Sequence, residues 1–168
     1  MNELRQYMEW IAIRGEEGTH TIGAFERFVI KYGYEFSGAV AIPERVMRGE
    51  MKKCFGNAAM VACIFPEEFI YTEGYALQSD IPIPIAHGWL TDRHGNVVDP
   101  TWGNDRHVDY FGVLIKHKYV RPRMGLSLID DYEHGWPLVR HKKPMTHIVT
   151  LEEWILPAAL DVVMASKS

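Results

Sequence analysis

The spacing of apolar and polar positions along the chain predicts both helices and strands. Apolar residues recur at helical intervals in residues 2–13 and 22–32. Strand-like patterns follow in residues 66–77, 81–91, 96–102 and 108–116. A closing helix is expected over residues 151–165, because Thr150 and Glu153 have the spacing of a capping box. Between these segments, residues 117–147 are rich in Gly and Pro and predict irregular connections with short strands. This mixture predicts the α+β fold class.

A short buried helix is predicted over residues 55–65, which are rich in Ala, Met and Val and contain no proline. The small residues Ala58, Ala59 and Ala62 would let a sheet approach this helix closely. Cys54 directly precedes the helix, where unpaired backbone N–H groups favour a thiolate over a thiol. The neighbouring side chains of Lys52 and Lys53 are expected to add to this effect.

The second cysteine, Cys63, is interpreted as a small buried hydrophobic residue, which is the commonest role of a free cysteine. It follows Cys54 by nine residues, and at about 100° per residue the two side chains fall on opposite faces of a helix. The sequence therefore predicts that the two cysteines share neither a site nor a disulfide.

Residues 81–91 and 96–102 are predicted to pair as a β-hairpin, since the four residues between them are typical of a turn. A two-residue turn would require a positive φ at His94. A three-residue loop that ends with Gly95 in the left-handed region suits the sequence better, and it pairs Asp92 with Asn96.

This register brings two chemically useful side chains together. Asp99 is expected opposite Trp89, and His87 becomes its diagonal neighbour on the same face, with Cβ atoms about 7 Å apart. An imidazole can reach a carboxylate across that separation. Cys54, His87 and Asp99 therefore predict a nucleophile, a base and the group that orients the base.

At these residues the chain resembles the transglutaminase-like branch of the papain-fold cysteine enzymes, a branch with many uncharacterised bacterial and phage members. The resemblance covers residues 50–103, about a third of the chain, and rests on CFGNAA, the strand YTEGYA, the histidine of HGWL and the aspartate of VVDPTW. It implies a transglutaminase-like core in which the helix carrying Cys54 packs on an antiparallel sheet carrying His87 and Asp99. It also implies a thioester acyl-enzyme intermediate.

The function expected from this pattern is a cysteine-dependent hydrolase that acts on an amide or acyl bond of a peptide, a protein or a small amide. Acyl transfer to an amine is the alternative. No cofactor and no metal are expected. Four residues are considered for substrate binding or oxyanion stabilisation, although packing roles are equally consistent with their types: Asn57, Glu73, Trp89 and Trp102.

Two readings from other classes stay open. His87, His94, His107 and Asp99 are close in sequence and suit zinc, although no helical histidine pair with an adjacent glutamate occurs. The chain could also be a binding module without catalysis, since fold does not fix function. Measurement of bound metal tests the first reading, and the reactivity of Cys54 tests the second.

Length and composition limit the remaining choices. The 168 residues, of which 47% are hydrophobic, predict one domain over residues 1–168 with its catalytic core at about 50–116. A net charge of −4 argues against nonspecific nucleic-acid binding. Neither a membrane-spanning run nor a signal peptide is recognised, so a cytoplasmic location is expected, consistent with two unpaired cysteines. The oligomeric state stays open.

Overall fold

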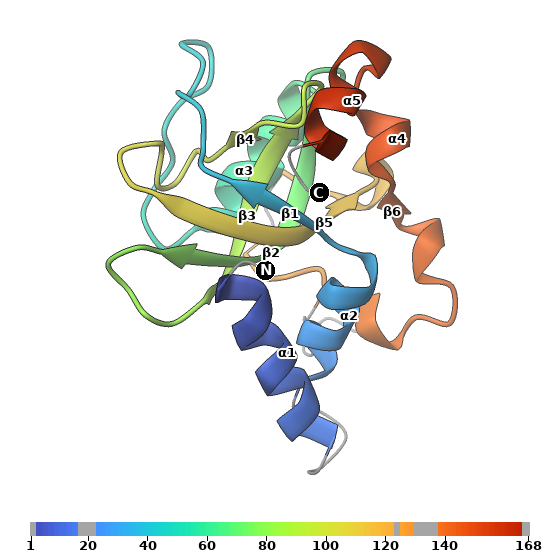
Figure 1. Ribbon diagram of the computed structural model, residues 1–168. Coiled ribbons are helices and arrows are strands. Elements are labelled where there is room, and N and C mark those ends of the chain that lie inside the picture. Colours follow the sequence, from blue (N-terminus) through green and yellow to red (C-terminus); the bar gives the residue numbers. More distant parts are fainter. Residues whose placement is uncertain (1–2, 17–22, 123–124, 130–137, 166–168) are drawn as a thin grey trace.

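The computed structural model describes residues 3–16, 23–122, 125–129 and 138–165. Within these residues the fold is mixed α+β and is built on one antiparallel sheet (Figure 1). Its strands run in the order β1-β5-β2-β3-β4, and β6 pairs with β5 outside that path. Their bounds are Tyr34–Ser37 (β1), Phe69–Gln78 (β2), Ile85–Asp92 (β3), Val97–Val98 (β4), Val108–Ile115 (β5) and Ile148–Val149 (β6).

The sheet is curled, because the segment that follows β1 also reaches the strand at the opposite edge. Gly38 has a φ of +66°, a left-handed conformation that turns the chain just after β1. Ala39 then forms a bridge with Val97 of β4, and the N–H of Val40 donates to the carbonyl of Val97 at 2.9 Å. The two edges of the sheet are thereby tied to each other.

One face of the sheet is covered by three helices: α1 (Glu3–Glu16), α2 (Ala24–Tyr32) and α3 (Cys54–Ile64). Helix α3 follows the expected bounds closely and packs against β2 and β3. Ala58, Ala59 and Ala62 are all completely buried in this contact, which confirms the prediction that small side chains let the sheet approach. None of the described helices is both long and apolar enough to cross a membrane.

The other face is covered by α4 (Leu151–Trp154) and α5 (Pro157–Ala165). The predicted capping box is present: the Thr150 hydroxyl accepts from the N–H of Glu153 at 3.3 Å, and the Glu153 carboxylate accepts from the N–H of Thr150 at 2.9 Å. The prediction of one continuous helix over 151–165 is wrong. The chain leaves the helix before Pro157, because proline lacks an N–H and disfavours helical φ and ψ in the residue before it.

Other elements differ from the sequence expectations for similar reasons. Strand β3 begins at Ile85 instead of residue 81, because Pro82 and Pro84 cannot donate ladder hydrogen bonds. The described parts of 117–147 contain 3₁₀ turns in place of strands, and β6 begins directly afterwards. Strand β1 was not predicted. The expectations for residues 2, 22, 123–124, 130–137 and 166–168 concern positions outside the described residues.

The hairpin of β3 and β4 has the predicted register. The N–H of Asp92 donates to the carbonyl of Asn96 at 3.0 Å, and the ladder continues through the pair Leu90 and Val98. Gly95 has a φ of +80°, as the three-residue loop requires. Strand β4 covers only Val97–Val98, so it ends four residues earlier than the predicted strand over 96–102.

Replacement of Gly95 with alanine is expected to lower the free energy of unfolding by about 1–3 kcal/mol. The added Cβ would lie 2.8 Å from side-chain atoms of both Ile155 and Val163, in a backbone conformation that L residues rarely adopt. The loop thus packs tightly against Ile155 and against Val163 of α5. The variant is therefore expected to lose stability, and to lose activity only as a consequence of unfolding. Gly125→Ala is the control, since that position has ordinary φ and open surroundings. Chemical denaturation of both variants tests this expectation, which equal midpoints would contradict.

Candidate active site

Cys54 occupies the first position of α3, which packs against β3. Burial raises the pKa of its thiol, but a hydrogen bond and an attractive charge interaction with His87 outweigh this effect. The backbone N–H groups of Gly88 and Phe55 also donate to the sulfur, and the pKa of Cys54 is lowered overall. The sequence predicted that the helix start, Lys52 and Lys53 favour the thiolate and that His87 is the base. The structure places His87 in contact with the sulfur and adds the N–H of Gly88.

His87 and Asp99 form a buried pair. Nε2 of His87 lies 2.8 Å from Oδ2 of Asp99, and both side chains are at most 1% exposed. Burial lowers the pKa of His87, but its bonds to Asp99 and Cys54 raise that pKa to about 9. Because Nε2 faces Asp99, Nδ1 is the ring nitrogen left for Cys54. The arrangement therefore favours a thiolate beside an imidazolium.

Asp99 is held by four donors. Oδ2 accepts from His87 and from the hydroxyl of Tyr110, at 3.0 Å for the hydroxyl. Oδ1 accepts from the backbone N–H groups of Thr101 and Trp102, at 2.8 and 3.0 Å. Burial raises the pKa of Asp99, whereas its bond to His87 and these N–H groups lower it, and the lowering prevails. Asp99 therefore stays ionised and its orientation is fixed.

Tyr110 was missed by sequence reasoning. It lies on β5, which is separated from Asp99 in the sheet by β2 and β3, so only the long-range pairing brings it close. The two N–H donors do have a local signal, since an aspartate before Pro-Thr-Trp is typical of an Asx turn. Asp99 thus forms a turn and orients the histidine at the same time.

The two candidate tryptophans take different positions. Trp102 is half-buried and stacks on the imidazole of His87, with ring centroids 3.9 Å apart and planes tilted by 14°. It also lines the cleft, as the sequence suggested. Trp89 is completely buried beneath the site and packs edge-on against Phe36. Its ring crosses Gly112, where an added Cβ would lie 2.4 Å from it, so Trp89 shapes the core behind the histidine.

Asn57 lies one turn along α3 from Cys54, but its amide points elsewhere. Its Nδ2 donates to the carbonyl of Glu50 at 2.7 Å and to the hydroxyl of Thr101 at 2.9 Å. These bonds use both amide hydrogens and tie α3 to the loop that follows Asp99. The structure therefore favours a packing role for Asn57 over donation to an oxyanion.

Glu73 faces the interior of the molecule and contributes nothing to the cleft wall. Its side chain is completely buried, and the hydroxyls of Tyr71 and Ser127 donate to it together with the N–H groups of Leu128 and Ile129, at 2.9 and 3.1 Å for the two N–H groups. Burial raises the pKa of Glu73 in spite of these donors. Its role is to fasten residues 127–129 to β2.

The cleft over the triad has a volume of about 740 Å³, within the usual range of ligand pockets. Cys54, His87 and Trp102 line its floor together with apolar and basic residues of the surrounding loops. The remaining lining residues are Arg48, Met51, Lys52, Phe55, Gln78, Ile81, Ile85, Ala86, Thr101, Asp105 and Arg106. A substrate in this cleft can therefore reach the sulfur and the histidine together.

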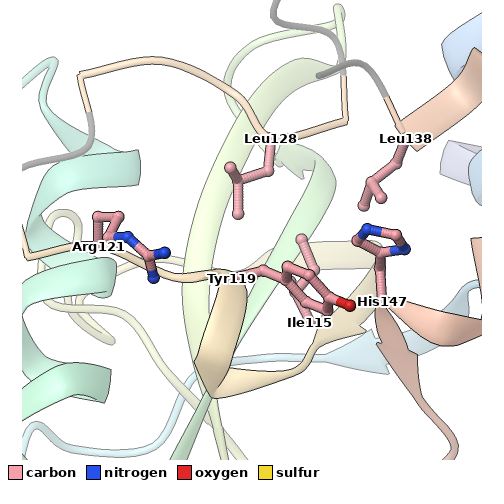
Figure 2. A pocket seen from close by; sticks show the side chains of 6 residues that line it. All are labelled: Ile115, Tyr119, Arg121, Leu128, Leu138 and His147. Carbon is pink, nitrogen blue, oxygen red and sulfur yellow. The ribbon is translucent and has the colours of Figure 1, made fainter. Parts of the chain in front are cut away.

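A smaller hollow of about 210 Å³ lies elsewhere and shares no lining residue with this cleft. In Figure 2, Tyr119 lies beside His147, and Leu128 and Leu138 face them from the other side of the hollow. The rings of Tyr119 and His147 stack with centroids 4.0 Å apart. The hollow is mostly apolar and is separate from the triad.

The histidines considered for zinc do not converge. In the described part of the chain, no three side chains of the types His, Cys, Asp and Glu gather where they would hold a metal ion. His94 lies at the hairpin tip, and Nε2 of His107 is 3.6 Å from the carboxylate of Asp109. Only His87 and Asp99 among the four candidates meet.

Comparison of the chain with protein-family models, with curated proteins and with solved structures finds no significant match.

Proposed function

We propose that the protein is a cysteine-dependent hydrolase that cleaves an amide or related acyl bond through a thioester intermediate, on a core of the transglutaminase-like type. The observation that carries this proposal is the chain of contacts from Cys54 through His87 to Asp99 at the floor of an open cleft. The lowered pKa of Cys54, the raised pKa of His87 and the lowered pKa of Asp99 all favour the charged forms that thiol catalysis uses.

In the first step, the Cys54 thiolate attacks the carbonyl carbon and forms a C–S bond, and the carbonyl electron pair moves to oxygen. The backbone N–H of Cys54, which has no intrahelical acceptor in the first turn of α3, is the donor for that oxyanion. His87 then gives its proton to the leaving amine as the C–N bond breaks. The products of this step are a free amine and an acyl thioester on Cys54.

In the second step, neutral His87 takes a proton from a water molecule as that water attacks the thioester. The C–S bond breaks, the carboxylic acid leaves, and the thiolate and imidazolium are restored. Asp99 stabilises the imidazolium in both steps without taking its proton. Trp102, stacked on the imidazole, shields the pair from water.

Acyl transfer is the second candidate, because an amine can replace water in the second step at the same thioester. The open cleft of about 740 Å³ has room for a second substrate above the sulfur. Hydrolysis is preferred because it needs only water.

A peptidyl vinyl sulfone is expected to label the parent protein at Cys54 alone, and a Cys54→Ser variant is expected to stay unlabelled. Vinyl sulfones react with activated thiolates, and only Cys54 has a lowered pKa together with a histidine partner. Intact mass measurement and peptide mapping read the result. Labelling at Cys63, or none at either cysteine under conditions that label papain-like enzymes, would overturn the proposal.

A further inference from the structure

A third hollow, which we name the α3 groove, adjoins the cleft at the turn before Cys54. It has a volume of about 1070 Å³ and runs along the outer side of α3. Arg48 and Lys52 line both hollows, so the cleft and the groove meet at these two side chains. The groove is also lined by the apolar side chains of Met47, Met60 and Ile64.

Lys52 has two properties that set it apart at this junction. Its φ is +66°, and it is the single non-glycine residue with a positive φ in the described part of the chain. Such strained conformations cluster at binding and catalytic sites. Lys52 also takes part in no ion pair or hydrogen bond among the described residues, whereas Arg45, Arg48, Lys53 and Arg106 each pair with a carboxylate. An exposed lysine that lines the cleft together with Cys54 thus has no counter-charge among the described residues.

The walls of the two hollows are apolar and unusually exposed. Met47 is 86% exposed, Met51 62%, Met60 42% and Ile64 59%. Methionine side chains adapt to varied apolar partners, and exposed apolar surface beside a polar rim marks binding sites. Met60 and Ile64 are one turn apart on α3, so they form a continuous apolar stripe along the groove.

We propose that the substrate is an extended polypeptide with an acidic residue next to the scissile bond, which Lys52 binds, and with apolar residues that lie in the α3 groove. This inference rests on the proposed function. A small amide would occupy the cleft alone, whereas a polypeptide crosses the junction into the groove and supplies both the missing carboxylate and the apolar side chains. Charge complementarity at Lys52 selects the acidic residue.

The test uses the Cys54→Ala protein, in which binding is measured without turnover. Fluorescein-labelled peptides of alternating leucine and glutamate, leucine and glutamine, and leucine and lysine are titrated by fluorescence anisotropy. The glutamate peptide is expected to bind about threefold to fivefold more tightly than the other two, as an ion pair at an exposed lysine supplies. Equal affinities for the glutamate and glutamine peptides would overturn the inference.

Three variants then locate the binding. Lys52→Gly keeps the backbone conformation without the ammonium and is expected to remove the preference for glutamate, whereas Lys52→Arg keeps it. The double variant Met60→Ser, Ile64→Ser is expected to lower the affinity for all three peptides by the same factor. Lys142→Gln, a matched loss of charge at an exposed lysine outside both hollows, is expected to change nothing. An unchanged preference in Lys52→Gly overturns the inference, as does displacement of the peptide by oligothymidylate in preference to unlabelled glutamate peptide.

The two proposals fail in different ways. Loss of the glutamate preference with intact vinyl sulfone labelling of Cys54 overturns the substrate inference alone. Absence of that labelling overturns the proposed hydrolase whatever the peptides do.

Discussion

Cys54→Ala is expected to lower turnover by roughly 10⁶-fold, because the variant has no nucleophile to form the thioester. Any peptide or thioester substrate found for the parent protein serves for the measurement. Trapping of the acyl-enzyme by acid quench and intact mass should show an adduct on the parent protein and none on the variant.

Cys63→Ala is the matched control for this experiment. Cys63 lies on the same helix and is half-buried instead of fully buried as the sequence predicted, and burial raises its pKa. Its removal is expected to leave turnover within about twofold, since its thiol contacts no member of the triad. Substantial turnover in Cys54→Ala, with circular dichroism unchanged, would show that the chemistry does not pass through this sulfur.

Asp99→Asn is expected to reduce kcat by roughly 10²–10⁴-fold without abolishing it. An asparagine oxygen can still accept from Thr101 and Trp102, but its NH₂ group then faces two donors, the imidazole of His87 and the hydroxyl of Tyr110. The neutral side chain also no longer stabilises the imidazolium. The pKa of His87 should therefore fall from about 9, and the alkaline limb of the pH profile should move to lower pH.

Tyr110→Phe is the control for Asp99→Asn. It removes one of the donors to Oδ2 and leaves the charge of Asp99 in place, so kcat is expected to fall by about tenfold at most. If the alkaline limb of the pH profile is unchanged in Asp99→Asn, Asp99 has only a packing role.

The parts of this site that the sequence predicts are those with local signals. The segment 92–96 determines the register of the hairpin. Gly95 can adopt a left-handed conformation, and the length of the loop then determines which residues face each other. The start of α3 at Cys54 follows from the Ala-rich segment after it. These two local features already bring His87 and Asp99 together.

The parts that the sequence does not predict depend on pairing between distant segments. Tyr110 reaches Asp99 only because β5 lies beside β2, and the sequence carries no local record of that neighbour. Glu73 is a charged residue on the otherwise largely apolar strand β2, which suggested a residue of the cleft wall. In the structure, residues 127–129 cover its side chain, and the sequence gives no local sign of this contact. Strand β1 is short and gains its hydrogen bonds from β5, which no local pattern indicates.

The break before Pro157 is a different case. It was predictable from the proline alone, yet the apolar spacing over 151–165 favoured one helix. Here the conformational limit of one residue outweighs the periodicity of the whole segment.

The most direct test of the account is the pH dependence of alkylation at Cys54, with Cys63 as the internal comparison. Iodoacetamide reacts with the thiolate, and peptide mapping gives the rate at each cysteine in one sample. We predict that Cys54 keeps its reactivity to a pH below the ordinary thiol pKa of 9.0, since reactivity is lost only as pH falls through its lowered pKa. Cys63 should lose reactivity already above pH 9.0, because its pKa is raised. Identical profiles for the two cysteines, or a Cys54 profile unchanged by His87→Ala, would contradict the thiolate and imidazolium pair.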